Sequence, residues 1–151
     1  MIKTELKYEH FKTICQDSGL KATTQRFILY KALLANGNHP TADQLYDSAA
    51  PDLPGLSRDT VYRTLNMLAS CGLAQKLVMP GGATHFDGDT SAHHHFLCEK
   101  CGEIFDLSWL DFDALPWPET LRQIGRPKRA LVLIAGVCRV CGPPDVTRPL
   151  L

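Results

Sequence analysis

The chain lacks an excess of either charge, because 16 Lys and Arg residues balance 16 Asp and Glu residues among its 151 residues. Proteins that coat nucleic acid through charge alone are strongly basic, so this composition argues against that class. The chain also lacks any apolar run that approaches the roughly 18 residues of a membrane span. Residues 1–5 are charged and lack the apolar core of a secretion signal. We therefore expect a cytoplasmic protein with no membrane partner.

The two halves of the chain differ only slightly in charge. Residues 1–86 contain nine Lys and Arg against seven Asp and Glu, a net charge of +2. Residues 87–151 contain seven against nine, a net charge of −2. If the protein binds DNA, a small local surface must do so.

Six cysteines are present, and four of them form two Cys-x-x-Cys pairs, Cys98 with Cys101 and Cys138 with Cys141. Two such pairs can build the closed four-sulfur site of a structural zinc ion. A redox-active Cys-x-x-Cys would need to open a helix in a βαβ unit, and a predicted strand follows Gly102 instead. In a cytoplasmic protein the remaining two, Cys15 and Cys71, fit buried apolar positions in helices.

Three consecutive histidines precede the first cysteine pair. Alternation along a strand places His93 and His95 on one side and His94 on the other. With the nearby carboxylates of Asp87 and Asp106, two imidazoles could bind Fe(II), Mn(II) or Zn(II), and the oxygen ligands favour the first two. The spacing of these residues does not decide whether His39 joins them.

The first half reads as helices followed by a hairpin. Helices are predicted over residues 4–17 and 24–35, from a capping box at Thr41, and from Ser57 to Cys71. Residues 73–86 form two strands about a glycine turn, which completes the outline of a winged helix-turn-helix. The last helix buries one apolar face and exposes candidate DNA contacts on the other: Arg58, Thr60, Tyr62, Arg63 and Asn66. The alternative is a merely solvated face, since Asp59 also lies there and repels phosphate.

A hinge is predicted at residues 87–92, and beyond it the sequence pattern favours strands over helices. Strands are predicted at residues 95–97, 104–107 and 130–137. A helix is expected between residues 109 and 124, mostly in the second half of that segment because of two prolines. The tail after Cys141 is proline-rich and expected to be disordered. The fold class is therefore α+β, with an N-terminal domain at residues 1–86 and a smaller α/β domain at residues 93–151.

Four motifs in order resemble the ferric uptake regulator (Fur) family. They are His39-Pro40-Thr41-Ala42, the helix at residues 59–65, the histidine and cysteine run at residues 93–102, and the closing pair at residues 136–141. The resemblance extends from about residue 20 to residue 142 and so covers nearly the whole chain.

The resemblance implies a homodimeric transcriptional repressor with an N-terminal winged helix and a C-terminal dimerisation domain. It implies that a regulatory metal between the domains favours binding to a near-palindromic operator in double-stranded DNA. The family's sensory ligands correspond to His39, Asp87, His93, His95 and Asp106. The cofactors implied are a structural Zn²⁺ and a regulatory Fe²⁺ or Mn²⁺.

Two aspartates in the sensory set resemble the peroxide-sensing branch, PerR, in which His39 or His93 would gain an oxygen atom and release the metal. Other branches often carry extra ligands, at places where this chain has His94, Ala130 and Leu133. An iron- or zinc-responsive repressor without peroxide sensing is the alternative. A metalloenzyme is a distant third reading, because five protein ligands leave little room for substrate and no Ser-His-Asp arrangement is evident.

Overall fold

The structure is a computed structural model that describes residues 2–142, with side chains from residue 7 onward. The chain divides into two compact units, Met1–Thr90 (unit 1) and Ser91–Leu151 (unit 2). The tail that we expect to be disordered lies, from residue 143 onward, outside the described residues. Within the described range, no helix is both long enough and apolar enough to cross a membrane.

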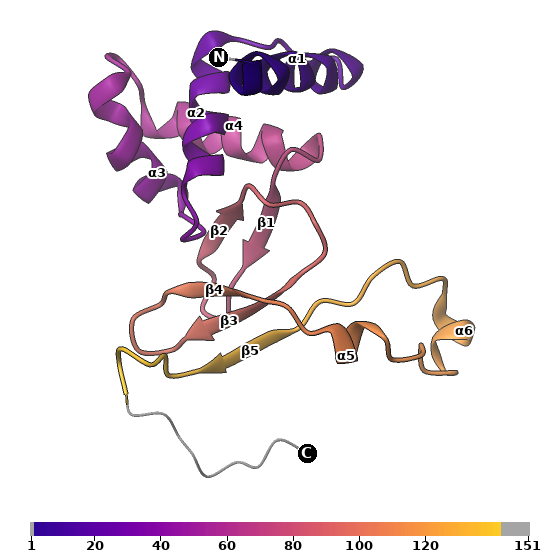
Figure 1. Ribbon diagram of the computed structural model, residues 1–151. Coiled ribbons are helices and arrows are strands. Elements are labelled where there is room, and N and C mark those ends of the chain that lie inside the picture. The colour runs from indigo at the N-terminus through magenta and orange to yellow at the C-terminus, as the bar shows by residue number, and fades with distance from the viewer. Residues whose placement is uncertain (1, 143–151) are drawn as a thin grey trace. The chain divides into compact units, whose positions relative to one another are not determined.

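The helices of unit 1 begin where the sequence places their caps (Figure 1). They are α1 (Ile2–Asp17), α2 (Thr24–Ala35), α3 (Ala42–Ala49), the short 3₁₀ helix η1 (Ala50–Asp52) and α4 (Arg58–Ser70). The hydroxyls of Thr23, Thr41 and Ser57 each accept a backbone N–H of the first turn that follows. The Gln44 side chain accepts the Thr41 N–H at 2.8 Å, so the predicted capping box is confirmed.

The core of unit 1 lies between these helices. Val61, Leu65 and Leu68 of α4 are fully buried, as their spacing predicts. Aromatic rings from the first two helices complete the core, since Phe11 stacks on Tyr30 with ring centroids 5.5 Å apart. Burial of this apolar face leaves the opposite face of α4 to solvent.

A β-hairpin follows α4 in unit 1. Strand β1 (Gln75–Val78) pairs antiparallel with β2 (Thr84–Asp87). Gly81 and Gly82 in the turn between them have φ of 96° and 89°, which glycine adopts readily. Asp87 pairs with Gln75 and ends β2, so the first residue of the predicted hinge lies in a strand. The helices and the hairpin together confirm the winged helix-turn-helix.

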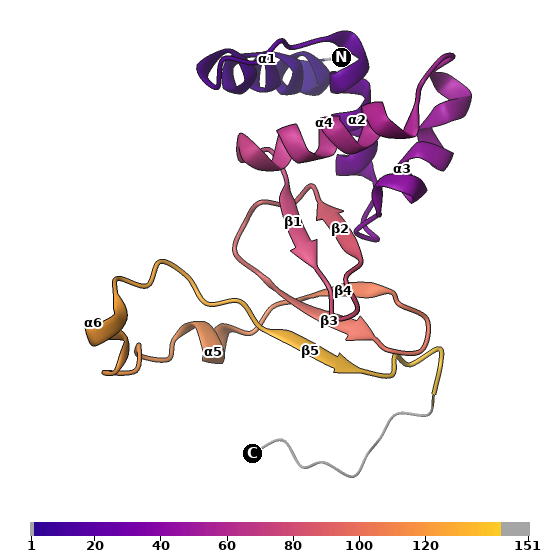
Figure 2. The ribbon, with the colours of Figure 1, turned by 180° about the vertical axis from the view of Figure 1, so that it is seen from behind.

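Unit 2 is built on a three-stranded sheet in the order β4-β3-β5 (Figures 1 and 2). Strand β3 (His94–Cys98) pairs antiparallel with β4 (Ile104–Leu107) and parallel with β5 (Leu133–Gly136). A parallel pair needs a long crossover connection, and residues 108–132 provide it. The predicted α+β class is therefore confirmed.

The crossover of unit 2 differs from the predicted helix. It contains two one-turn helices, α5 (Leu110–Asp113) and α6 (Leu121–Ile124), separated by an irregular stretch. One turn therefore lies in the first half of the segment, although the helix was expected mostly in the second half. Pro116 and Pro118 lack a backbone N–H and separate the two turns, which explains why no longer helix forms.

Candidate metal centres and nucleic-acid interface

The four predicted zinc ligands come together in unit 2. Strands β3 and β5 are parallel, and Cys98 pairs with Gly136, so both Cys-x-x-Cys turns follow the same edge of the sheet. The four Sγ atoms lie within 4.8 Å of one another, and those of Cys101 and Cys138 are 3.9 Å apart. Four sulfurs arranged tetrahedrally at about 2.3 Å from one zinc ion lie about 3.8 Å apart. The arrangement fits a closed four-sulfur site formed by Cys98, Cys101, Cys138 and Cys141.

Hydrogen bonds shift the pKa values of these thiols in opposite directions. The backbone N–H groups of Cys138 and Cys101 donate to Cys98 Sγ at 3.3 and 3.5 Å and lower the pKa of Cys98 to about 6. These two bonds therefore favour the thiolate form of Cys98. Hydrogen bonds to the sulfurs of Cys138 and Cys101 raise the pKa of Cys141 to about 12. Metal binding to this site must displace the proton from Cys141.

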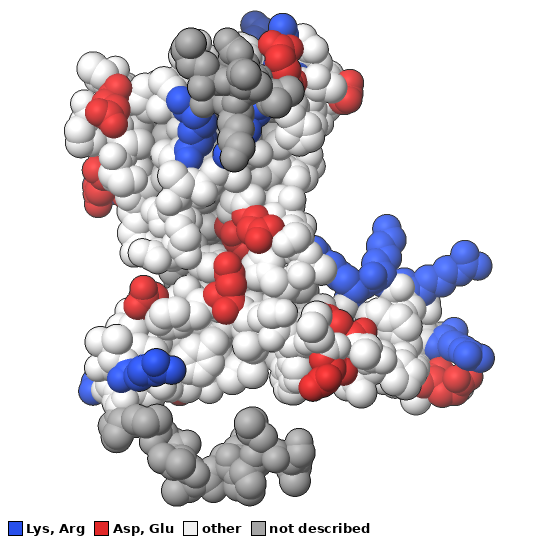
Figure 3. All heavy atoms as spheres, viewed as in Figure 1, with Lys and Arg blue, Asp and Glu red and all other residues white. Residues whose placement is uncertain are grey.

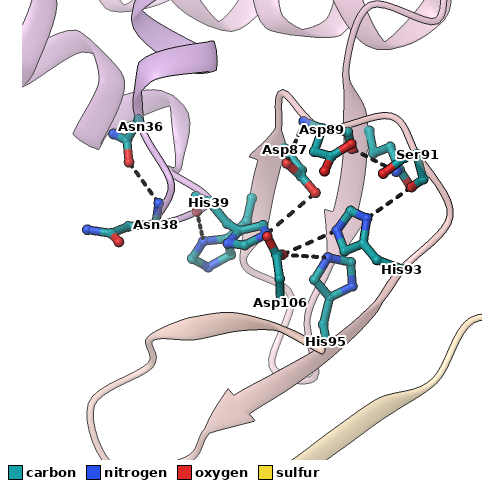
Figure 4. Close-up of polar contacts among 11 residues, drawn as sticks. Asn36, Asn38, His39, Asp87, Asp89, Ser91, His93, His95 and Asp106 are labelled. Carbon is teal, nitrogen blue, oxygen red and sulfur yellow. Dashed lines mark hydrogen bonds and ion pairs between the residues drawn. The ribbon is translucent and has the colours of Figure 1, made fainter. Parts of the chain in front are cut away.

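Two predicted regulatory ligands lie together in unit 1. His39 lies between α2 and α3, and its Nε2 is 3.5 Å from Asp87 Oδ2 at the end of β2 (Figure 4). The other Asp87 oxygen accepts the Asp89 N–H at 2.8 Å, which orients the carboxylate. His39 has a φ of 49°, a left-handed conformation that costs a residue with a side chain about 1–3 kcal/mol. Such strain is typical of a functional position.

The other three predicted ligands lie together in unit 2. Asp106 of β4 pairs with His95 of β3, and its Oδ1 lies 3.2 Å from His93 Nε2 and 3.8 Å from His95 Nε2. Figure 4 shows both rings turned towards this carboxylate. Atoms bound at about 2.1 Å to one metal ion lie about 3.0–3.4 Å apart. The pair in unit 1 and the trio in unit 2 therefore each have spacings close to those of metal ligands, and each supplies only imidazole and carboxylate.

His94 points away from its two neighbours, as strand alternation predicts. Its Nε2 is 3.0 Å from Asp113 Oδ1 in α5, and its Nδ1 accepts the Val132 N–H at 3.1 Å. A ring nitrogen that accepts an N–H carries no proton, so the other nitrogen donates to Asp113. His94 therefore links β3 to both ends of the crossover. No sequence pattern predicts these partners, because Asp113 and Val132 are distant from His94 along the chain.

The exposed face of α4 carries the five predicted DNA contacts, several of them already in polar contacts. Arg58 donates to Asp43 and Asp47 of α3 at 2.5 and 3.0 Å, an arrangement that ties α3 to α4. Arg63 Nε donates to Asp59 at 2.8 Å, one turn earlier. The remaining contacts are local ones: Thr60 with the Ser57 hydroxyl, and Asn66 with Tyr62 O and Lys76. Tyr62 is half exposed.

A polar hollow of 420 Å³ adjoins the start of α4 in unit 1. Its wall combines three basic residues with three threonines from the α1–α2 connection, α2 and α4: Lys21, Thr23, Arg26, Thr60, Arg63 and Thr64. Cations and hydroxyls are the groups that bind phosphate oxygens. Lys21 and Arg26 lie far from α4 along the chain, so the sequence alone did not indicate that they line one hollow with it.

Unit 2 carries its own group of exposed basic side chains (Figure 3). They lie on α6 and on the segment that leads to β5: Arg122, Arg126, Lys128 and Arg129. Arg122 pairs with Glu119 at 3.1 Å, three residues earlier, and is 81% exposed. This pair resembles Arg63 with Asp59 in exposure and spacing, so it provides a control for mutations in α4.

Sequence comparison relates the chain to known regulators. Residues 17–115 match the profile of the ferric uptake regulator family. The chain is 34% identical over 109 residues to the peroxide-responsive repressor PerR of Staphylococcus saprophyticus, covering 72% of this chain and 74% of that protein. It is 33% identical over 94 residues to PerR of Staphylococcus aureus, covering 62% and 64%.

Solved structures show the same fold. The Helicobacter pylori ferric uptake regulator, described with three functional metal-binding sites, superposes with a TM-score of 0.75 at 18% identity and covers 94% of this chain and 95% of its own. PerR from Streptococcus pyogenes, described in terms of peroxide sensing and gene regulation, gives a TM-score of 0.50 at 26% identity and covers 89% and 92%. With the profile match and the sequence relatives, these results show that the chain belongs to the ferric uptake regulator family.

Proposed function

We propose that the protein is a metal-dependent transcriptional repressor that binds operator DNA as a homodimer. The observation that carries this proposal is the presence of two chemically different ligand groups in one winged-helix chain. Four sulfurs form one group in unit 2, and imidazoles lie beside carboxylates within each of the two units. Soft sulfur ligands suit a permanent zinc ion, whereas imidazole and carboxylate suit a metal that exchanges.

The four cysteines would hold a structural Zn²⁺. All four positions of a tetrahedral zinc ion are then filled by protein, so the ion has no open position for chemistry. Cys101 and Cys138 are 37 residues apart along the chain. The two Cys-x-x-Cys turns to which they belong lie at the ends of β3 and β5, so one zinc ion would join those ends. Zinc binding would therefore contribute directly to the folding of unit 2.

The regulatory metal would be bound by His39 and Asp87 from unit 1 and by His93, His95 and Asp106 from unit 2. This assignment follows the family resemblance, and the spacings within each unit support it. A metal that needs ligands from both units would restrict their relative motion. The bound form would then favour one arrangement of two winged helices on DNA, and metal loss would release it.

Peroxide sensing is the branch of function that we propose for this site. The PerR relatives and the paired aspartates support it. Bound Fe(II) would supply the chemistry that reduces hydrogen peroxide beside its ligands. Because their imidazoles would be among the nearest oxidisable groups, His39 or His93 would gain one oxygen atom while one peroxide becomes water. An oxidised imidazole is a poorer ligand, so the metal ion would dissociate. The two units would then no longer be linked through it, and the protein would release DNA.

Unit 2 would provide the dimer interface. Phe105 and Ile134 flank Phe96 on one face of its sheet, and both are more than a third exposed. An exposed apolar patch of this kind marks a surface for protein contact. A second copy of unit 2 would cover it and would place two winged helices about one two-fold axis.

The α4 helix would read the major groove of each half-site, with half-sites about one helical turn apart. Tyr62 and Arg63 are the proposed base contacts, flanked by Arg58, Thr60 and Asn66. Arg63 must exchange its bond to Asp59 for a bond to DNA. Arg58 is bound to two carboxylates, so a role in holding α3 against α4 accompanies any phosphate contact.

Arg63→Ala tests this interface. Binding to a duplex selected from a random library with Mn(II) is expected to weaken by about 1–3 kcal/mol, with changed sequence preference, if Arg63 reads a base. Arg122→Ala is the matched control, because it removes an equally exposed, ion-paired arginine from unit 2. Fluorescence anisotropy at one salt concentration gives both values. An Arg63→Ala affinity equal to that of the control would remove this face of α4 from the interface.

A further inference from the structure

His85 has no part in the proposed function, yet it contacts the backbone of a proposed metal ligand. Its Nδ1 lies 2.7 Å from the carbonyl oxygen of His39. A carbonyl oxygen can only accept a hydrogen bond, so Nδ1 must carry a proton and donate it. This contact joins residues 46 positions apart and lies wholly within unit 1.

The short connection that carries His39 is fixed at successive points. The Asn38 N–H donates to Asn36 Oδ1 at 3.0 Å just after α2 ends. His85 then binds the carbonyl of His39, and the Phe86 N–H donates to the carbonyl of Pro40 at 2.9 Å. Strand β2 therefore binds two consecutive carbonyls of the connection, one through a side chain and one through its backbone. These bonds stabilise the left-handed conformation of His39.

The same strand supplies the carboxylate that faces the His39 ring. His85 and Asp87 are two residues apart on β2, so alternation places them on one face. One of them binds the backbone of His39, and the other lies 3.5 Å from its Nε2. Figure 4 shows the Asp87 carboxylate beside His39.

Packing fixes the end of β2 beside α2. A Cβ added to Gly88 would lie 3.2 Å from Leu34 Cα and 3.3 Å from Leu33 O, closer than such atoms normally approach. A side chain at this position would therefore require α2 or the end of β2 to shift by a few tenths of an ångström. The strand that holds both His85 and Asp87 cannot easily shift along the connection that carries His39.

We propose that His85 is a positioning residue of the regulatory metal site. It holds the His39 backbone so that the imidazole faces Asp87 before a metal ion binds, which lowers the ordering cost of binding. This inference rests on the proposed function of His39 as a ligand. Groups that orient metal ligands typically change metal affinity about 10- to 100-fold when removed.

Three substitutions separate this role from simple packing. His85→Asn keeps a donor close to the position of Nδ1, whereas His85→Gln moves the donor one bond further out, and His85→Ala removes it. In the zinc-loaded full-length protein, His85→Ala and His85→Gln are expected to weaken Mn(II) binding about 10-fold or more. His85→Asn is expected to stay within about threefold of the wild type if the hydrogen bond is what matters. Loss of the free Mn(II) electron paramagnetic resonance signal measures the affinity.

A second readout needs no regulatory metal. Amide hydrogen exchange at residues 38, 39 and 41 of the zinc-loaded protein without Mn(II) should accelerate in His85→Ala and His85→Gln but not in His85→Asn. Equal Mn(II) affinity in the wild type and His85→Ala, with His39→Ala clearly weaker, would overturn the positioning role alone. Equal loss of Mn(II) affinity in all three His85 variants would mean that His85 acts through packing, and would also overturn the positioning role. If His39→Ala binds Mn(II) as the wild type does, the regulatory site itself is wrong.

Discussion

Replacing Cys98 with serine is expected to release the zinc ion and unfold most of unit 2. Cys98 is fully buried, and two backbone N–H groups already stabilise its thiolate. Serine cannot supply a thiolate at neutral pH, and three sulfurs leave the site open. The structural-zinc free energy of small domains is about 10–16 kcal/mol, so a large loss of stability follows for a sheet of three short strands. Zinc analysis and hydrogen exchange resolved along the sequence measure both effects.

Cys71→Ser is the matched control for this experiment. Cys71 is half-buried at the end of α4 and donates to Leu68 O, outside the four-sulfur site. Its substitution is expected to leave one zinc ion per chain and protection in unit 2 unchanged. Wild-type protein that is folded and holds no zinc under reducing conditions would contradict the four-sulfur site. Zinc retained in full by Cys98→Ser would remove that residue from it.

Brief peroxide treatment of the Fe(II) form is expected to add one oxygen atom to the peptide that contains His39 or to the one that contains His93. The same treatment of the Mn(II) form should leave both peptides unchanged, because Mn(II) does not readily transfer an electron to peroxide. Mass spectrometry of the digested protein measures the gain. DNA affinity of the oxidised Fe(II) form should fall to that of protein without regulatory metal.

His10 provides an internal control in the same spectra. It is an exposed histidine of α1 that belongs to neither ligand group. Oxidation of His10 at the same rate as His39 and His93 would indicate oxidants in solution rather than a site reaction. If the Fe(II) form stays unoxidised and bound to DNA while iron concentration alone controls binding, the iron-regulator alternative replaces peroxide sensing. The fold and the zinc site would be unaffected.

Local sequence patterns predicted the first unit well. Thr41 with Gln44, and Ser57 before α4, start helices through contacts within one turn, so a few neighbouring residues determine them. The buried positions of α4 follow from helical spacing alone. The two Cys-x-x-Cys pairs likewise predict their own assembly, because four sulfurs with this spacing have few other stable arrangements.

Contacts between residues distant along the chain could not be predicted from the sequence. The crossover of unit 2 was expected to contain one helix, but Pro116 and Pro118 separate two short turns. His94 links the first of these turns, α5, to β3 through Asp113. The acidic partners of Arg58 come from another helix, 11 and 15 residues away. The bond from His85 to His39 depends on how β2 meets the α2–α3 connection, which no local pattern encodes.

Selection from a random duplex library, with and without Mn(II), tests metal-dependent DNA recognition most directly. The zinc-loaded protein is incubated with the library in parallel at one salt concentration, and the bound duplexes are sequenced. We expect enrichment of a near-palindrome with half-sites about one helical turn apart in the presence of Mn(II), and its loss without Mn(II) or in Asp106→Ala with Mn(II). Equal enrichment with and without Mn(II), or no enrichment in either, would contradict the proposed function.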